Sequence, residues 1–455
     1  MRIHTFKYNN KALAFFPDTF RFFEINENTE NLITSYLNSE SIDEVTSKFC
    51  ISSDEYNSFV DNLKKYAYTD IETEDKALIN KNSKNVLDRL VLNISNNCNL
   101  SCKYCYAHGG NYNSDKSMMS NQIALDSLDL FFNQFDKING LQVFGGEPCL
   151  NIPVIEVILD HLDKMKNSGR IESMPNIGLV TNGTILNDTI IELIKKYNIA
   201  VTVSLDGPAA VNNSQRVFKD GKGTSEIIEK NILRMKAETG QPSTIEVTYN
   251  NYHVENSISI IDIIKYFDTK FKGIGLHIAP VSGLKDEPFL LKDRNEFIDS
   301  VEDVFGTIKD NKMLNYSLVQ RIIDSIKSKR SSKCLCTAGI GTLSVSAKGD
   351  IYPCFMFTDE AEYLLGNIYD ENVFSSSTMK KHMQKYFSFS KLTEQPCKDC
   401  FINRICSGCL GANYFDTGEI FAPSQAHCNM QRKMVEKVLF SLVNLKNKNQ
   451  LSVAK

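Results

Sequence analysis

Three cysteines near residue 100 have a spacing that suits metal chemistry. Cys98, Cys102 and Cys105 form the pattern C-x3-C-x2-C directly after an apolar, strand-like run. Three thiolates so close together can bind three irons of a four-iron cluster, which leaves the fourth iron open to another ligand. The alternative is a zinc ion with His108 as fourth ligand, although zinc more commonly uses paired C-x2-C units. The spacing therefore favours an iron–sulfur cluster.

Most of the remaining cysteines gather in the C-terminal part of the chain. Two C-x2-C pairs, at 397–400 and 406–409, fit a zinc ribbon as well as iron–sulfur chemistry. Eight thiolates would serve two four-iron clusters with four ligands each. The eight are Cys334, Cys336, Cys354, Cys397, Cys400, Cys406, Cys409 and Cys428.

Composition restricts the class of protein. The chain has 455 residues, 13 cysteines and a net charge of −4, which argues against a protein that binds nucleic acid through a large basic surface. No apolar run reaches the roughly 18 residues that span a bilayer. The apolar run at 12–16 is shorter than the h-region of about 7 residues that a signal peptide needs. We therefore expect a cytoplasmic protein whose cysteines bind metal or do redox work, with no disulfide framework.

Alternating strand and helix patterns begin near residue 88. Such alternation predicts a parallel sheet with helices outside, closed as a partial (β/α)6 barrel. Chemistry in these folds takes place at the carboxyl ends of the strands. The expected strands are 89–95, 140–146, 176–183, 200–207, 243–250 and 273–281, and the expected helices are 121–135, 152–166, 187–197, 225–239 and 255–267.

Smaller regions flank the expected barrel. Residues 2–8 and 11–25 are rich in β-formers, with turns at Asn9-Asn10 and Pro17-Asp18. Helical patterns then begin near Thr29 and at Ser52 or Ser53, and a charged linker follows at 69–86. An amphipathic helix is expected near the C-terminus, at 429–446. We divide the chain into an α+β domain at 1–85, a barrel domain at 86–325 and a Cys-rich domain at 326–455.

The motifs together resemble the radical S-adenosylmethionine enzymes. In that family C-x3-C-x2-C follows the first barrel strand, and Gly145-Gly146-Glu147-Pro148, Thr181-Asn182-Gly183 and Ser204-Leu205-Asp206-Gly207-Pro208 occur here after the next three. The resemblance covers roughly residues 88–285. It implies that a four-iron cluster on the first three cysteines binds S-adenosylmethionine and generates a 5′-deoxyadenosyl radical. The residues that it places around this cofactor are Tyr104, Gly145, Gly146, Glu147, Thr181, Asn182, Ser204, Asp206 and Arg216.

Several of these residues have chemistry suited to that cofactor. Gly145 and Gly146 allow close backbone approach because glycine has no Cβ. Glu147 can accept a hydrogen bond from the amine of the cofactor, and Arg216 can pair with its carboxylate in a bidentate manner. The resemblance further suggests that Tyr104 lies against the adenine.

The C-terminal cysteines resemble the SPASM extension of radical enzymes that modify peptides and proteins. The pattern C-x12-G-x4-C, which begins at Cys336, is part of this resemblance. It implies two auxiliary four-iron clusters, hence three clusters in all. The downstream one would use Cys397, Cys400, Cys406 and Cys428. The upstream one would use Cys336, Cys354 and Cys409, with Cys334 as candidate fourth ligand or, without it, an iron open to a substrate thiolate.

Several functions fit this resemblance. The preferred one is a maturase that forms thioether crosslinks in a short, ribosomally made, Cys-containing precursor peptide, as sactipeptide and ranthipeptide maturases do. The alternatives are carbon–carbon crosslinking, formylglycine formation in sulfatases, and a non-catalytic peptide-binding protein. Sulfatase maturases usually have an Asp base directly after the cysteine matching Cys354, where this chain has Phe355, which cannot take a proton. The N-terminal region resembles the winged-helix element that binds leader peptides, although a dimerisation domain is the alternative.

Further expectations concern the partners and one leftover cysteine. We expect a flavodoxin- or ferredoxin-type electron donor, an anaerobic setting, and no nucleic-acid or membrane partner. No general base is identified from the sequence. Cys149 follows Pro148 at the barrel mouth, so it either touches substrate or is a small buried apolar residue.

Overall fold

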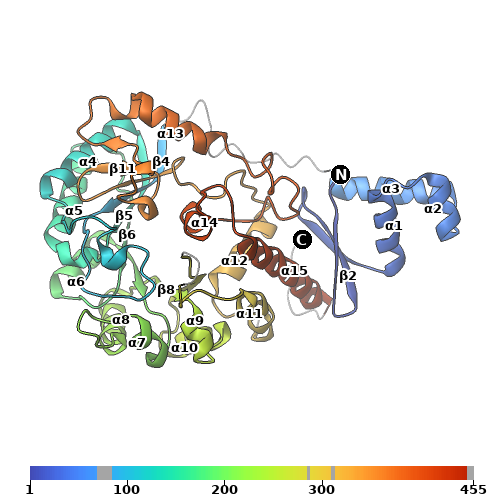
Figure 1. Ribbon diagram of the computed structural model, residues 1–455, viewed down its shortest axis with the longest axis horizontal. Coiled ribbons are helices and arrows are strands. Elements are labelled where there is room, and N and C mark those ends of the chain that lie inside the picture. The colour runs from blue at the N-terminus through green and yellow to red at the C-terminus, as the bar shows by residue number, and fades with distance from the viewer. Residues whose placement is uncertain (69–84, 284–286, 309–312, 448–455) are drawn as a thin grey trace.

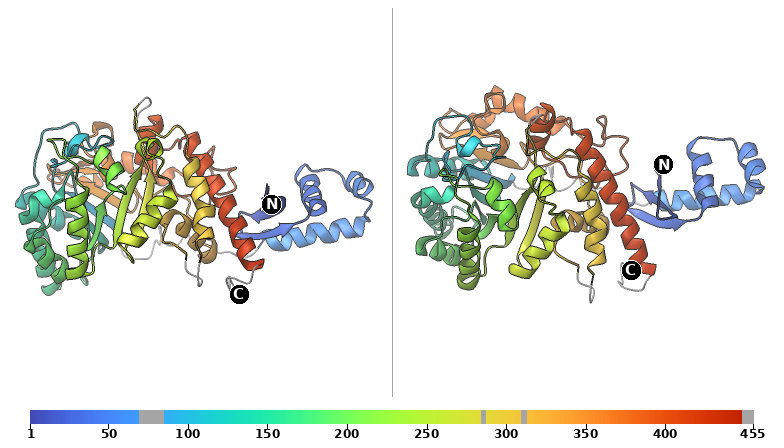
Figure 2. Two further views of the ribbon diagram at one scale, coloured as in Figure 1. Left: turned by 90° about the horizontal axis from the view of Figure 1, so that it is seen from below. Right: turned by 60° about the horizontal axis from the view of Figure 1, so that its bottom comes forward.

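The computed structural model of the protein describes residues 1–68, 85–283, 287–308 and 313–447. The expected linker at 69–86 therefore falls almost wholly outside the described residues. The described chain forms a three-stranded sheet and a nine-stranded sheet. Figures 1 and 2 show the first three helices standing away from the body of the molecule on the side where the small sheet lies.

The N-terminal unit, residues 1–68, is an antiparallel sheet followed by three helices. The two-residue turn at Asn9 and Asn10 has positive φ at both positions, as a tight hairpin requires. Capping boxes at Ser41 and Ser52 start the second and third helices. The sequence predicted the strands and two of the helices but missed α2. The elements are β1 (His4–Tyr8), β2 (Lys11–Phe16), β3 (Arg21–Ile25), α1 (Glu27–Leu37), α2 (Ile42–Phe49) and α3 (Ser53–Ala67).

Six parallel strands form the centre of the large sheet and confirm the predicted partial barrel. They pair in chain order. Along β6 and β8, for example, residues that pack on the outer helices alternate with residues that face the interior of the barrel, which we call the lumen. The strands are β4 (Val86–Asn93), β5 (Lys137–Phe144), β6 (Asn176–Thr181), β7 (Ala200–Ser204), β8 (Thr244–Tyr249) and β9 (Gly275–Pro280).

Helices cover the outside of this sheet, as Figure 1 shows. The predicted helix at 255–267 is wrong at its start, because Ser257 has a left-handed backbone and Ser259 caps a new helix. The helices are α4 (Asn121–Gln134), α5 (Ile152–Asn167), α6 (Asp188–Tyr197), α7 (Ala209–Gln215), α8 (Ser225–Thr239), α9 (Asn251–Glu255) and α10 (Ile260–Lys270).

The C-terminal region adds three strands to the barrel sheet, which the sequence did not predict. Strand β10 (Thr342–Val345) pairs in parallel with β4, and β11 (Asp350–Tyr352) and β12 (Gly366–Asn367) continue the sheet antiparallel. The Cys-rich region is therefore joined to the first barrel strand by backbone hydrogen bonds. Two helices precede the Cys-rich region, α11 (Asn295–Gly306) and α12 (Ser317–Ser328). The helices of the region itself are α13 (Ser377–Ser388), α14 (Leu410–Thr417) and α15 (Gln425–Asn447).

One large apolar core unites these parts. It runs from the barrel strands and helices through α11, α12 and α15, and it includes Leu13 and Phe15 of β2. Across this junction His4 stacks on Phe401 with ring centroids 3.5 Å apart, and its Nε2 lies 2.9 Å from a carboxylate oxygen of Glu436. The N-terminal sheet is thus packed firmly against α15. None of the described helices is long and apolar enough to cross a bilayer.

Candidate active site

The loop after β4 carries the first three cysteines and is held by a segment that follows β7. The backbone amide of Ser101 donates to the carbonyl of Val217 at 2.8 Å, and that of Lys103 donates to Gln215 at 3.0 Å. These hydrogen bonds bring the thiols beside Arg216. The tertiary fold therefore gathers groups that are more than 100 residues apart in sequence.

The surroundings of these thiols fit an iron–sulfur cluster. Burial raises the pKa of Cys98 to about 11 and that of Cys102 to about 12, so both stay protonated until a cation binds. The side-chain amide of Asn182 lies 3.7 Å from the Cys98 sulfur, and Arg216 Nη1 lies 4.0 Å from the Cys102 sulfur. N–H donors and positive charge beside thiolate sulfur are groups that tune such clusters.

Among the described residues, no three His, Cys, Asp or Glu side chains are grouped so as to hold a single metal ion. A four-iron cluster does not need such a group, because each thiolate binds a different iron.

Gly145 and Gly146 bring the next loop into contact with the cysteine loop. The amide of Gly146 donates to the carbonyl of Ser95 at 2.7 Å, and the amide of Glu147 donates to Asn97 at 2.9 Å. A Cβ on Gly146 would lie 2.5 Å from the Asn97 carbonyl oxygen, which is closer than real Cβ contacts. Only glycine permits this approach.

Glu147 is fully buried and joins two strand ends. One of its oxygens accepts from the Cys149 amide at 2.9 Å and the Thr181 hydroxyl at 2.8 Å, and the other accepts from the Asn182 amide at 2.7 Å. Burial raises its pKa, and these three hydrogen bonds oppose that shift. Glu147 therefore fixes the position of Thr181 and Asn182, which lie at the end of β6.

Asp206 organises the residues expected around the cofactor. Its buried carboxylate accepts from Arg216 Nε at 2.9 Å, from the Tyr104 hydroxyl at 2.5 Å and from the Thr248 amide at 3.0 Å. Burial alone would lower the pKa of Arg216, but the Asp206 charge raises it well above its usual value. Arg216 also lies 5.5 Å from the centre of the Tyr104 ring. Asp206 thus holds Arg216 and Tyr104 in one arrangement.

A row of three side chains faces the lumen at the height of Ser204. In the sheet register Ser204 is the partner of Glu246, and Glu246 is the partner of His277, so all three point to the same side. Burial raises the pKa of Glu246 and lowers that of His277 to about 4. The His277 Nδ1 lies 2.7 Å from the Ser317 hydroxyl. The sequence analysis missed Glu246, whose signal was a lone acid within an apolar strand.

The cysteines assigned to the upstream auxiliary cluster lie near one another. Cys336, Cys354 and Cys409 interact electrostatically, and burial raises the pKa of Cys354 to about 12. The Met356 sulfur lies 3.5 Å from that of Cys409. Phe355 packs against Phe144 at the end of β5 in a tilted arrangement, with ring centroids 4.3 Å apart.

The cysteines assigned to the downstream cluster also gather. Cys397, Cys400, Cys406 and Cys428 interact electrostatically with one another. A buried lysine that the sequence analysis missed, Lys391, lies among them, and its ammonium donates to the Cys406 carbonyl. Burial lowers the pKa of Lys391 and the nearby sulfurs oppose this shift; Cys334 is one of those sulfurs. Cys334 thus lies near Lys391 and the downstream group.

Cys149 and Asp359 each have a defined place beside these loops. Cys149 is 3% exposed, packs in the main core, and its sulfur lies 3.6 Å from the Thr181 hydroxyl. Asp359 joins the Cys-rich region to the first cysteine loop: its carboxylate accepts from Asn96 at 2.9 Å and from the Ser114 hydroxyl. This carboxylate is therefore already used in holding the loop.

Two family models match the chain. The model of the radical SAM superfamily matches residues 92–267, and that of SPASM, an iron–sulfur cluster-binding domain, matches residues 334–401. The first covers the loops around the cysteine motif and Arg216. The second covers five of the eight C-terminal cysteines.

Curated relatives agree with these matches. The chain is 27% identical over 370 residues to the radical SAM cyclopropyl synthase TigE of Paramaledivibacter caminithermalis, which covers 76% of this chain and 72% of TigE. It is 30% identical over 287 residues to an uncharacterised protein of Methanocaldococcus jannaschii, covering 63% of this chain and 90% of the relative.

Solved structures share the fold. The structure of anSMEcpe with bound AdoMet superposes with a TM-score of 0.65 at 19% identity, covering 79% of this chain and 99% of the other. Streptococcus suis SuiB bound to its precursor peptide SuiA superposes with a TM-score of 0.53 at 15% identity, covering 91% of this chain and 96% of SuiB. The likeness to SuiB extends over most of the chain.

Proposed function

The chain belongs to the radical SAM superfamily and carries a SPASM domain, and we propose that it forms thioether crosslinks in a short, ribosomally made precursor peptide. Enzymes of this family use S-adenosylmethionine and iron–sulfur clusters, and the cofactor supplies a 5′-deoxyadenosyl radical that abstracts hydrogen from the substrate. The three expected clusters, the cysteine ligands and the domain bounds at 85 and 325 are parts of this proposal. A flavodoxin- or ferredoxin-type protein would supply the first electron.

The observation that carries the thioether proposal is the composition of the upstream thiol group. Cys336, Cys354 and Cys409 lie together, and we assign these three to one cluster. Three thiols leave one iron of a four-iron cluster without a protein ligand. A substrate cysteine would fit that position, because metal ligation stabilises a thiolate.

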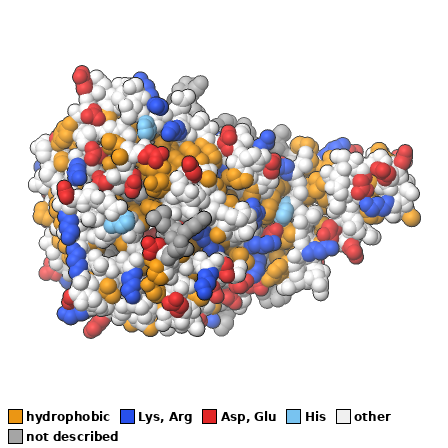
Figure 3. Space-filling model, in the orientation of Figure 1, with side chains coloured by type: hydrophobic (Ala, Val, Ile, Leu, Met, Phe, Trp, Pro, Cys, Tyr) orange, Lys and Arg blue, Asp and Glu red, His pale blue; other side chains and the backbone are white. Residues whose placement is uncertain are grey.

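The residues of the barrel mouth would hold the cofactor. Cys98, Cys102 and Cys105 would bind the first cluster, and Arg216, fixed by Asp206, would pair with the carboxylate of S-adenosylmethionine. Asp206 itself has its hydrogen bonds filled by the protein, so its role is to position Arg216 and Tyr104. Hydrophobic side chains gather in the middle of the face shown in Figure 3, where α14 and nearby loops lie, and would limit the access of water.

We assign to Glu246 the role of accepting the proton of the substrate thiol. Formation of one thioether removes a hydrogen atom from carbon, which leaves as part of 5′-deoxyadenosine, and a proton from the thiol. One electron must also leave, and an auxiliary cluster can accept it. The Glu246 carboxylate faces the lumen at the height of Ser204 and forms no hydrogen bond with the described residues. A raised pKa in such a position suits a proton acceptor.

The N-terminal unit would bind the leader segment of the peptide. Its strand β1 is an edge of the three-stranded sheet, so a peptide can add as a further strand. The SuiB structure contains a bound precursor peptide, and the fold likeness to SuiB includes most of this chain. These two observations support the recognition role.

A second candidate is carbon–carbon bond formation. The match to a cyclopropyl synthase favours it, because a cyclopropyl group forms by joining two carbons. Formylglycine formation is less favoured, since Phe355 packs against Phe144 where an acid would be expected. Asp359, a few residues away, already accepts from Asn96 and Ser114.

The mass of the product separates these candidates. The protein is co-expressed anaerobically with a short Cys-containing peptide encoded beside its gene, and the peptide is weighed before and after thiol alkylation. We expect a loss of two hydrogens per link and cysteines that no longer alkylate. A loss of hydrogens with all thiols free would establish the carbon–carbon alternative. Crosslinking by a variant with Cys98, Cys102 and Cys105 changed to Ala would contradict the radical mechanism.

The role of Glu246 has its own test in the same assay. We expect Glu246→Gln to cleave S-adenosylmethionine but to form the crosslink about 10²-fold more slowly, the usual loss for a missing acid–base group. Raising the pH should restore part of the rate, because solvent then removes the thiol proton. Uncoupled 5′-deoxyadenosine release distinguishes this outcome from a folding defect. An unchanged crosslinking rate would assign the proton to another group.

A further inference from the structure

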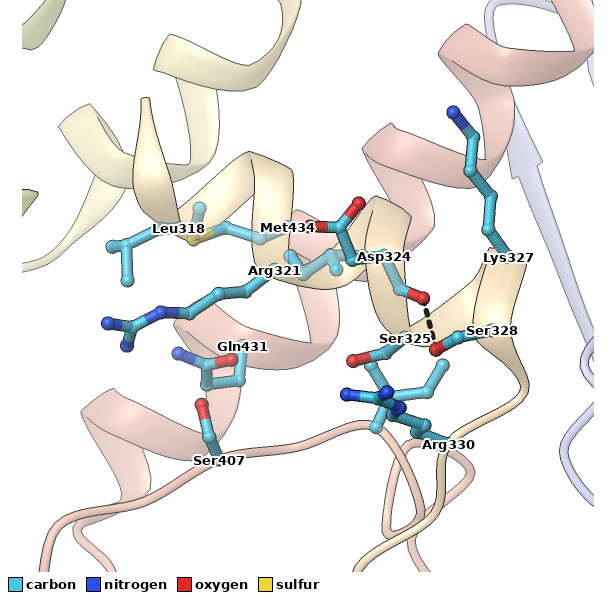
Figure 4. A pocket seen from close by; sticks show the side chains of 12 residues that line it. Leu318, Arg321, Asp324, Ser325, Lys327, Ser328, Arg330, Ser407, Gln431 and Met434 are labelled. Atoms are coloured by element: carbon cyan, nitrogen blue, oxygen red, sulfur yellow. Dashed lines mark hydrogen bonds between the residues drawn. The ribbon is translucent and has the colours of Figure 1, made fainter. Parts of the chain in front are cut away.

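A cavity of about 510 Å³ lies outside the residues discussed so far. It is partly open to solvent and is lined by α12, α15 and the segment around Ser407, as Figure 4 shows. Arg321, Gln431 and Ser407 lie together at one end, and Arg330 and Ser325 lie at the other. Leu318, Ile322 and Met434 add apolar surface to the lining.

Three polar side chains of this cavity, those of Arg321, Arg330 and Gln431, are without partners among the described residues, whereas Asp324 and Ser328 form hydrogen bonds. Neither Arg321 nor Arg330 forms an ion pair or hydrogen bond with the described residues, although Asp324 also lines the cavity. Gln431 is 8% exposed, and its amide likewise has no hydrogen-bond partner among those residues. The polar atoms of the Gln431 amide are not among the fully buried, unpartnered atoms of the described residues, so the amide opens onto the cavity and is available to a ligand.

The charge of the lining defines the chemistry of that ligand. Two guanidinium groups can each bind a carboxylate through two parallel hydrogen bonds. Because they stand at opposite ends of the cavity, a ligand with two separated carboxylates would contact both. The apolar strip between them suits the backbone and aliphatic parts of a peptide.

The position of the cavity connects it with the barrel. Helix α12 packs against β9, the last barrel strand, and α15 contacts β3 of the N-terminal sheet. The positive charge of Arg321 contributes to lowering the pKa of His277 and opposes the rise in the pKa of Glu246; both of these side chains face the lumen. A peptide bound in the cavity would therefore have the N-terminal unit on one side and the barrel lumen on the other.

We propose that this cavity binds an acidic segment of the precursor peptide, with one carboxylate on Arg321 and Gln431 and a second on Arg330. The segment lies between the part held by the N-terminal unit and the part that reacts in the lumen. The inference rests on the proposed function in naming a peptide as the substrate, but the binding it predicts needs no turnover.

Binding of defined peptides to the intact holoenzyme tests the site. The probes are fluorescein-labelled (Ser-Glu-Gly)3 and (Ser-Gln-Gly)3, titrated anaerobically at low salt and followed by anisotropy. We expect the Glu probe to bind at least about tenfold tighter, which corresponds to roughly 1.4 kcal/mol. The double variant Arg321→Gln/Arg330→Gln should remove this preference, and Gln431→Met should weaken the Glu probe severalfold. Equal affinity for both probes would overturn the proposal.

Control measurements separate a peptide site from a general anion site and from a nucleic-acid site. Lys381→Gln removes one exposed positive charge from α13 and should leave the affinity within about twofold of the unchanged protein. Unchanged affinity of the double variant would contradict the site, and so would displacement of the probe by an equal concentration of inorganic phosphate. Tighter binding of a thymidine nonanucleotide, lost in the double variant, would instead indicate a nucleic-acid ligand. Confirmed peptide binding without crosslinking would uphold the site and contradict the proposed reaction.

Discussion

At the scale of single residues, the barrel mouth depends on buried groups that hold others in place. Asp206 is fully buried and pairs with Arg216, whose side chain is 9% exposed, while accepting a hydrogen bond from Tyr104. Glu147 has the same function for Thr181 and Asn182. Such buried networks are costly when incomplete and rigid when complete. Their rigidity places side chains for a cofactor that reacts only in one orientation.

Replacement of Asp206 tests whether this carboxylate positions Arg216 and Tyr104. Asp206→Asn leaves the Arg216 charge buried without a partner, which costs about 3–5 kcal/mol when a buried pair is broken. We expect a clearly lower thermal midpoint and at least about tenfold weaker binding of S-adenosylmethionine, measured by equilibrium dialysis. Asp220→Asn is the matched control, because Asp220 forms an ion pair with exposed Lys222. If both variants bound the cofactor equally well, Asp206 would have no positioning role.

At the scale of elements, the N-terminal sheet is attached to the rest by a polar clamp beside its apolar contact. The Asp18 carboxylate accepts from Arg2 at 2.5 Å and from Arg404 at 3.0 Å, and Arg2 also donates to Asn403. Partial burial would raise the pKa of Asp18, but the two arginines lower it overall. The clamp therefore stabilises the junction above the ordinary pKa of 3.8 and weakens as the pH falls through the lowered value.

Loosening this clamp should affect the junction more than the global fold. Asp18 is 35% exposed, so Asp18→Asn should cost no more than about 1 kcal/mol, or roughly fivefold in local opening. We expect faster hydrogen exchange in residues 4–25 at neutral pH and a smaller difference near pH 3. Asp61→Asn on α3, whose partner Lys64 is exposed, is the control and should leave those residues unchanged. Equal exchange in both variants would show that apolar packing alone holds the sheet.

At the scale of the whole molecule, the Cys-rich region and the barrel form one structure. Strand β10 extends the barrel sheet beyond β4, so the two regions share a ladder of hydrogen bonds. Asp359 adds a second link, from the Cys-rich region to the loop of the first three cysteines. The distance between the expected cluster sites is thereby fixed by secondary structure rather than by a linker.

The link through Asp359 has a measurable consequence. Asp359→Ala removes the hydrogen bonds to Asn96 and Ser114, so the first cysteine loop should become more mobile. We expect the purified variant to contain less iron, by up to the content of one cluster, while the auxiliary clusters remain. Iron analysis measures the total iron, and electron paramagnetic resonance identifies the clusters that are present. Glu360→Ala, the neighbouring loss of one acid, should keep the full iron content. A variant of Asp359 with full iron content and unchanged spectra would assign the link no part in cluster binding.

The sequence by itself determined the alternation of strands and helices, the local cysteine spacings and the polar residues at strand ends. These follow from short-range rules: turn chemistry at Asn9-Asn10, capping at Ser52, and side-chain periodicity along each strand. The family matches then support the interpretation of the motifs that those elements carry.

Only the tertiary structure decided which distant residues meet. It joined β10 to β4, set Cys334 near Lys391, and placed Glu246 in the lumen beside Ser204. The extra strands escaped the sequence analysis because β10 and β11 are short and gain their stability from pairing rather than from intrinsic preference. The cavity at Arg321 and Arg330 escaped it for a related reason: its walls come from α12, α15 and a loop that converge only after folding. Local interactions define the elements, and long-range packing defines the sites between them.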